Sequence, residues 1–109
     1  MLLTPGWAPN LTYRDPECQL TFARLLTHYW SQGCFLTEGE IRANMHRIAD
    51  IPAVLIHGSY DVSGPLDSAW HLHRARPNSR LVILEDAGHG GGSFAHELVG
   101  ALDCFRTLL

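Results

Sequence analysis

The chain has 109 residues, the size of one modest domain; 46% of them are hydrophobic and 17% charged, as in a folded globular protein. Its formal net charge of −3 argues against nucleic-acid binding, and no polybasic segment points to a membrane surface. No apolar run approaches the roughly 20 residues that span a bilayer, and the start of the chain lacks the features of a signal peptide. We therefore expect no nucleic-acid partner and no membrane partner.

The cysteines indicate a reducing compartment. Cys18, Cys34 and Cys104 are widely spaced and include no C-x-x-C pair. This spacing argues against a disulfide framework and against a zinc site. The expectation is a cytoplasmic protein with no metal and no cofactor.

Residues 1–16 contain several prolines and are expected to form an irregular lead-in. An amphipathic helix is predicted over 17–31, because Asp15 can cap it, Pro16 suits its first position and apolar residues recur three to four apart. Gly33 is expected to end this helix.

A second, shorter helix is predicted after Thr37-x-x-Glu40, which fits a capping box. Ile41, Met45 and Ile48 would form one apolar stripe on it.

The next segments predict strand, helix, strand, helix. Apolar runs at 53–56 and 81–84 are typical of strands buried on both faces of a parallel sheet. A helix over 65–75 would connect them and make them parallel, and a last helix is predicted over 94–109 with Ser93 as its cap. Asp61 and His89 then follow the two strands at the same sheet edge, where open α/β folds place their sites.

Several motifs in this order are characteristic of one peptidase family. They are Phe22-Ala23-Arg24 with His28-Tyr29-Trp30, His57-Gly58-Ser59-Tyr60-Asp61, Ala69-Trp70-x-Leu72-His73, and Asp86-Ala87-Gly88-His89. Together they resemble the C-terminal portion of the prolyl aminopeptidases (proline iminopeptidases), serine peptidases of the α/β-hydrolase fold.

The resemblance implies an α/β fold that forms the C-terminal part of an α/β-hydrolase. After the lead-in over 1–16, residues 17–48 would supply two cap-type helices, and residues 49–109 the C-terminal part of the core. Two parallel strands are fewer than the roughly four that a freestanding sheet domain normally carries. The chain therefore reads as a segment of a longer protein.

The resemblance also implies roles for individual residues. Asp61 would be the triad acid and His89 the triad base, and the substrate would be a peptide with an N-terminal proline. His28, Tyr29 and Trp30 would line the substrate pocket, unless they pack between helices instead.

The expected nucleophile is missing from the sequence. No serine of the chain sits in a G-x-S-x-G motif, so the chain alone is expected to be inactive unless an N-terminal half completes it. Two positions also depart from the family pattern: Leu26 replaces a glutamate that would bind the substrate amine, and Ser59 replaces an arginine.

Other functions stay open. A non-catalytic α/β module could bind a partner or associate with itself through an exposed sheet edge. A weaker alternative is a small hydrolase that uses Cys34 or Ser93 as its nucleophile. Weaker still are an oxyanion hole or a phosphate site at residues 89–92.

The remaining aromatic and histidine residues have structural interpretations. We expect Trp70 in the core, one of His71 and His73 exposed and the other packed, and His96 on the surface. His57 and Asp86 should lie at the strand ends without catalytic duties.

Overall fold

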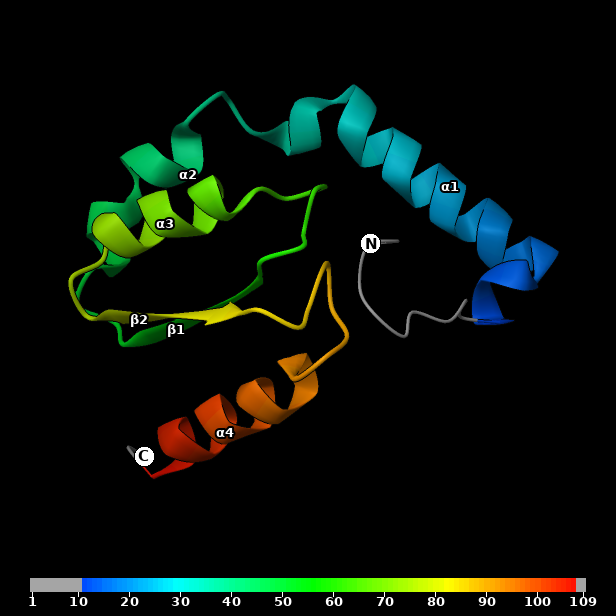
Figure 1. Cartoon of the computed structure of the whole chain (residues 1–109). Helices are drawn as coiled ribbons and strands as arrows, with labels where there is room; N and C mark the ends of the chain where they lie inside the picture. The colour runs from blue at the N-terminus through cyan, green and yellow to red at the C-terminus, as the bar shows by residue number, and fades with distance from the viewer. Residues whose placement is uncertain (1–10, 108–109) are drawn as a thin grey trace. The chain divides into compact units, whose positions relative to one another are not determined.

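A computed structural model describes residues 11–107 (Figure 1). The chain divides into two units, whose described parts are residues 11–43 and 44–107. Part of the lead-in predicted over 1–16 lies outside the described residues; from Leu11 to Arg14 it forms a 3₁₀ helix, η1.

Helix α1, Pro16–Ser31, begins as its sequence predicts. The Asp15 carboxylate accepts a hydrogen bond of 2.8 Å from the backbone N–H of Cys18, and Pro16 occupies the first turn, where its missing N–H costs nothing. The cap residue precedes Pro16 in extended conformation. The predicted helix over 17–31 is confirmed.

A left-handed turn ends this helix. Gly33, Cys34 and Phe35 all have φ near +57°, with values of 58°, 56° and 58°. They form the short 3₁₀ segment η2, Gly33–Phe35. The turn brings the Phe35 ring within 5.7 Å of the Tyr29 ring, centroid to centroid.

The prediction of a second, continuous helix is wrong. The chain forms α2, Glu40–Ala43, and then a 3₁₀ helix, η3, Met45–Ile48. Asn44 separates them with φ −97° and ψ 4°, a conformation outside the helical region that asparagine tolerates well.

The predicted pairing of Thr37 with the Glu40 carboxylate is present at the start of α2. The Glu40 carboxylate accepts from the Thr37 backbone N–H at 2.8 Å, as a capping box requires. The Thr37 hydroxyl also donates to that carboxylate, at 2.9 Å. The Glu40 backbone N–H donates to the Thr37 carbonyl at 3.1 Å.

The unit that contains residues 44–107 confirms the predicted α/β arrangement. Its regular elements are β1 Ala53–Gly58, α3 Leu66–Arg74, β2 Ser79–Leu84 and α4 Phe94–Arg106. The strands form a two-stranded parallel sheet whose register runs from Ala53↔Ser79 to Gly58↔Leu84. In Figure 1, α3 and α4 lie on opposite sides of this sheet.

The core is small, and two burial predictions are wrong. Both strands are mostly half-buried, and Ile83 is 47% exposed, because in the described chain each strand has one strand neighbour. Trp70 is 48% exposed on α3, where the Arg74 guanidinium lies over its ring. Among residues 11–107, the buried apolar side chains are Met45, Leu84, Ala87 and Ala101.

Across residues 11–107, no helix combines the length and the hydropathy that crossing a membrane requires.

Candidate active site

Two loops meet beyond the carboxyl ends of the parallel strands. One follows β1, and the other joins β2 to α4. Backbone hydrogen bonds continue the sheet between them: Ser59 N–H donates to the Leu84 carbonyl at 2.8 Å, and Tyr60 N–H donates to the Ala87 carbonyl at 3.1 Å. These backbone hydrogen bonds therefore fix the separation of the two loops without any contribution from side chains.

These loops bring Asp61 and His89 together. Nδ1 of His89 lies 2.7 Å from Oδ2 of Asp61, although the residues are 28 positions apart in the sequence. The Asp61 side chain is 7% exposed and the His89 side chain 63%. The expected juxtaposition of this acid and this histidine is thus present in the structure.

A turn after β1 holds the Asp61 carboxylate. Its Oδ1 accepts hydrogen bonds from the Ser63 N–H at 3.0 Å, the Ser63 hydroxyl at 2.8 Å and the Gly64 N–H at 2.9 Å. The turn thus fixes one carboxylate oxygen and directs the other, Oδ2, to His89. The roles of Ser63 and Gly64 were not predicted from the sequence, although an aspartate that bonds the backbone two residues on is a common turn signal.

The Asp61 carboxyl is held ionised. Burial alone would raise its pKa, but the hydrogen bonds donated by Gly64, His89 and Ser63 outweigh that effect and keep the pKa well below its ordinary value. An ionised carboxylate can only accept, so Nδ1 of His89 must donate. The lone pair of a neutral His89 imidazole is then on Nε2.

The imidazole faces an open cavity of about 370 Å³. His57, Asp61, His89 and Phe94 are among the residues that line it. Among the described residues, none hydrogen-bonds Nε2 of His89. A basic nitrogen beside an open cavity is arranged to take a proton from a group that enters there.

Neither alternative nucleophile hydrogen-bonds the His89 imidazole in the described part of the chain. The Ser93 hydroxyl, one of the alternative nucleophiles, donates to Asp86 at 2.8 Å. Ser93 also stands at the predicted cap position of α4, but its side chain makes no capping bond to the helix. Cys34, the other alternative, is an exposed free cysteine in the unit that contains residues 11–43.

The histidines of α3 and α4 lie as expected. His71 is exposed and pairs with Asp67 at 3.2 Å, whereas His73 is half-buried and bonds the Ser79 hydroxyl at 2.8 Å. His96 is exposed. Within residues 11–107, no three histidine, cysteine or acidic side chains are grouped to hold a metal ion.

His28, Tyr29 and Trp30 lie in the last turn of α1. The His28 and Tyr29 rings each lie within 5.7 Å of the Phe35 ring, and Trp30 is 70% exposed. Their role in substrate binding stays a prediction.

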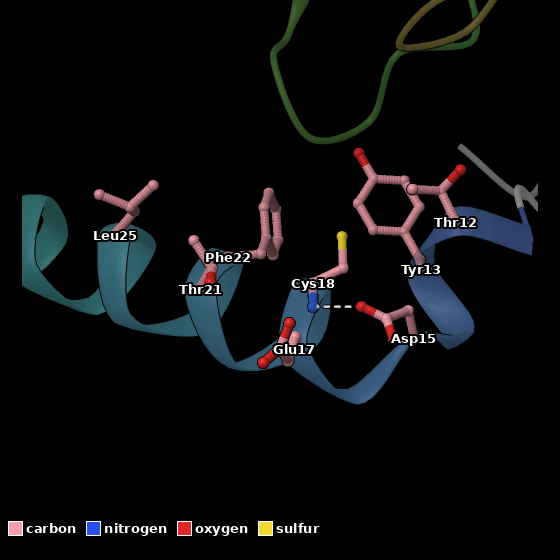
Figure 2. Close-up of a pocket in the computed structure, with 8 residues that line it drawn as sticks. All are labelled: Thr12, Tyr13, Asp15, Glu17, Cys18, Thr21, Phe22 and Leu25. Carbon is pink, nitrogen blue, oxygen red and sulfur yellow. Dashed lines mark hydrogen bonds between the residues drawn. The ribbon is translucent and has the colours of Figure 1, made fainter.

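The unit that contains residues 11–43 also has a cavity of about 550 Å³ that sequence analysis did not predict. Figure 2 shows the side chains of Tyr13, Cys18 and Phe22 on one side of α1. The Tyr13 and Phe22 rings meet edge to face at 5.6 Å. Cys18, Phe22 and Leu25 are four and three residues apart, a spacing that could have indicated this face of α1. The predicted apolar stripe ran through Leu20, Ala23 and Trp30 instead, and Tyr13 precedes the helix.

Several known proteins similar to this chain are named proline iminopeptidase or probable proline iminopeptidase. No protein-family model matches the chain. It is 45% identical to a proline iminopeptidase of Xanthomonas citri over 83% of its length, and 41% identical to a probable proline iminopeptidase of Streptomyces coelicolor over 84%. It is 34% identical to a proline iminopeptidase of Arabidopsis thaliana over 99%. These alignments span 28%, 30% and 30% of the relatives. The chain therefore belongs to the proline iminopeptidase family and matches less than a third of the length of these members.

Proposed function

We propose that the chain supplies the acid and the base of a serine-peptidase triad in a prolyl aminopeptidase of the α/β-hydrolase fold. Asp61 is the acid, and His89 is the base. The observation that carries the proposal is the hydrogen bond of 2.7 Å between Asp61 Oδ2 and His89 Nδ1. Similarity to proline iminopeptidases supports the reaction and the class of substrate, a peptide with an N-terminal proline.

The roles follow from the chemistry of the pair. A serine hydroxyl is a weak nucleophile until a neighbouring imidazole accepts its proton. Asp61 holds the proton of His89 on Nδ1 and stabilises the positive charge that forms when Nε2 takes up the second proton. Nε2 then returns this proton to the leaving amine.

The nucleophile and the oxyanion hole belong, in this proposal, to a segment outside these 109 residues. The sequence contains no G-x-S-x-G motif, and its relatives are more than three times as long as the matched segment. The chain alone is then inactive. His28, Tyr29 and Trp30 would contribute to the substrate pocket, and Leu26 would leave the substrate amine without the glutamate of the family pattern.

A chimera tests the proposal. This chain would replace the aligned segment of the Xanthomonas citri proline iminopeptidase, and hydrolysis of a fluorogenic proline amide would be followed. Asp61→Asn or His89→Ala should each lower kcat/KM by about 10⁴-fold. Activity that survives either substitution would refute the assignment.

A second acid–histidine pair provides the matched control. Asp67 and His71 lie 3.2 Å apart on α3, and both are exposed. Asp67→Asn and His71→Ala change the same residue types and should leave kcat/KM within about twofold of the parent chimera, since exposed pairs contribute little to stability. The isolated chain should show no turnover and no fluorophosphonate labelling above that of denatured protein.

The sheet edges favour one competing function. In the part of the chain that the structure describes, each strand has a single neighbour, so each outer edge carries backbone groups without a strand partner. A module that associates through these edges would dimerise with rising concentration in analytical ultracentrifugation. A compact monomer at all concentrations would argue against this function.

A further inference from the structure

The loop that carries His89 has little rigidity of its own. Glycines precede and follow His89, and Gly90, Gly91 and Gly92 have φ of 112°, 81° and 53°. Glycine loses more conformational freedom on folding than any other residue. A further interaction is therefore needed to hold His89 Nδ1 at 2.7 Å from Asp61 Oδ2.

Asp86 provides one from the start of the loop. Its Oδ2 accepts from the Ser93 backbone N–H at 2.8 Å, and its Oδ1 accepts from the Ser93 hydroxyl at 2.8 Å. The two residues are seven positions apart and enclose His89 between them. The Asp86 carboxylate therefore links the two ends of the loop that carries His89, residues 86–93 (the His89 loop).

The Ser93 end of this loop is itself held in place by α4. Ser93 directly precedes α4, and α4 packs against β1, the strand that leads to Asp61. A carboxylate next to the first turn of a helix also interacts favourably with the helix dipole. Asp86 thus connects the loop of His89 to α4, which packs against the strand that leads to Asp61.

The loop closes tightly on this carboxylate. A Cβ on Gly92 would lie 2.5 Å from the Asp86 carbonyl oxygen and 2.8 Å from its Cγ. The hydrogen bonds from Ser93 also keep the pKa of Asp86 below its ordinary value, so the carboxylate is ionised near neutral pH.

We propose that Asp86 is a positioning residue that holds the His89 loop so that Nδ1 meets Asp61. This inference rests on the proposed function, because it assigns Asp86 a part in setting the geometry of the acid–base pair. It revises the expectation that Asp86 only lies near the site. Asp86 does not contact the imidazole and acts through the backbone of the loop.

The test measures the tautomer of the His89 imidazole. Loss of a hydrogen bond with only a structural role would not change this tautomer. In the full chain labelled with ¹⁵N-histidine, long-range ¹H–¹⁵N correlation spectra distinguish a proton on Nδ1 from one on Nε2. The wild type should show neutral His89 with its proton on Nδ1. In Asp86→Ala, the signal should move to the averaged position of an unrestrained histidine.

Two further variants make the test specific. Ser93→Ala removes only the hydroxyl bond and should give an intermediate tautomer ratio with the fold retained, even where Asp86→Ala does not fold. Glu85→Gln removes the neighbouring exposed carboxylate and should leave the signal unchanged. In the chimera, Asp86→Asn should lower kcat by about 100-fold with little change in KM.

The outcomes separate the two proposals. A wild-type protein without the Nδ1 tautomer would overturn the acid–base pair itself. A wild-type protein with that tautomer, together with an unchanged ratio in Ser93→Ala and unchanged kcat in Asp86→Asn, would overturn the role of Asp86 alone.

Discussion

Gly58 and Gly88 touch through their backbones at the point where the two loops of the site leave the sheet. A Cβ built on Gly58 would collide with the Gly88 carbonyl oxygen and would lie 2.6 Å from the Ala87 carbonyl carbon. Backbone atoms of a sheet extension cannot move aside as a flexible side chain can. The close approach of the histidine loop to the end of β1 thus requires a residue without a side chain at position 58.

Gly58→Ala should therefore destabilise the protein and separate Asp61 from His89. The expected loss in the free energy of unfolding is about 1–3 kcal/mol, the usual cost of overpacking a tight site. Urea unfolding measures this loss. Gly100→Ala is the control, since nothing lies within 4 Å of a Cβ at this position of α4. It should instead stabilise the helix by about 1 kcal/mol. Equal effects at both positions would contradict the argument.

The hydrogen bonds to Asp61 predict how stability depends on pH. In the folded protein its pKa lies below the ordinary value, so the unfolded chain takes up a proton at a higher pH than the folded chain does. The contribution of Asp61 is complete above about pH 5 and is lost as the pH falls through about 4 and below. The free energy of unfolding should decrease in that direction.

Asp61→Asn should flatten this dependence. Urea unfolding from about pH 6 to about pH 3 measures the slope for each variant. A smaller slope should remain, because hydrogen bonds from Ser93 lower the pKa of Asp86 and those from Thr37 lower that of Glu40. Asp67→Asn, at a side chain that is 75% exposed, is the control. A wild-type slope no steeper than that of Asp61→Asn would contradict the assignment.

Local sequence rules were sufficient for the elements around the site. Each strand is a short apolar run, and one helix separates the strands, which makes them parallel. That topology alone places Asp61 and His89 at the same edge. Their meeting was predictable because it depends on the direction of two strands and not on side-chain detail.

Local sequence rules did not predict the hydrogen bonds that close a loop. They also did not predict the exposure of side chains that no other described segment covers. The bond from Ser93 to Asp86 spans seven residues of glycine-rich loop, and nothing in the local pattern identifies it. Trp70 was expected in the core, but in the described chain it is 48% exposed. Asn44 divides the predicted second helix because its backbone leaves the helical region, with φ −97° and ψ 4°, and the apolar spacing on either side of it gave no sign of this break.

The cap of α1 predicts a difference between two substitutions of one residue. Asp15→Ala removes the acceptor of the Cys18 N–H, shown as a dashed line in Figure 2, and should lower the free energy of unfolding by about 1 kcal/mol. Asp15→Asn keeps a capping oxygen and should retain most of that stability. Hydrogen exchange at the amides of α1 measures both. Equal protection in the two variants would exclude a capping role.

The left-handed turn after α1 predicts an unusual order of stabilities at Cys34. Its φ of 56° costs an L-residue about 1–2 kcal/mol, and a β-branched side chain fits this region worst. Because Cys34 is exposed, packing does not offset this cost. Cys34→Gly should therefore be more stable than Cys34→Val by about 1 kcal/mol or more.

Cys104 is the matched position, since it is also an exposed free cysteine but lies within α4. Glycine is the poorer residue inside a helix, so Cys104→Val should be more stable than Cys104→Gly by ~0.3 kcal/mol. Urea unfolding of the four variants compares the two orders directly. The reversal between the positions isolates backbone conformation as the cause, because the same pair of side chains is exchanged at both. The same order at Cys34 and Cys104 would show that the turn does not require a left-handed residue at position 34.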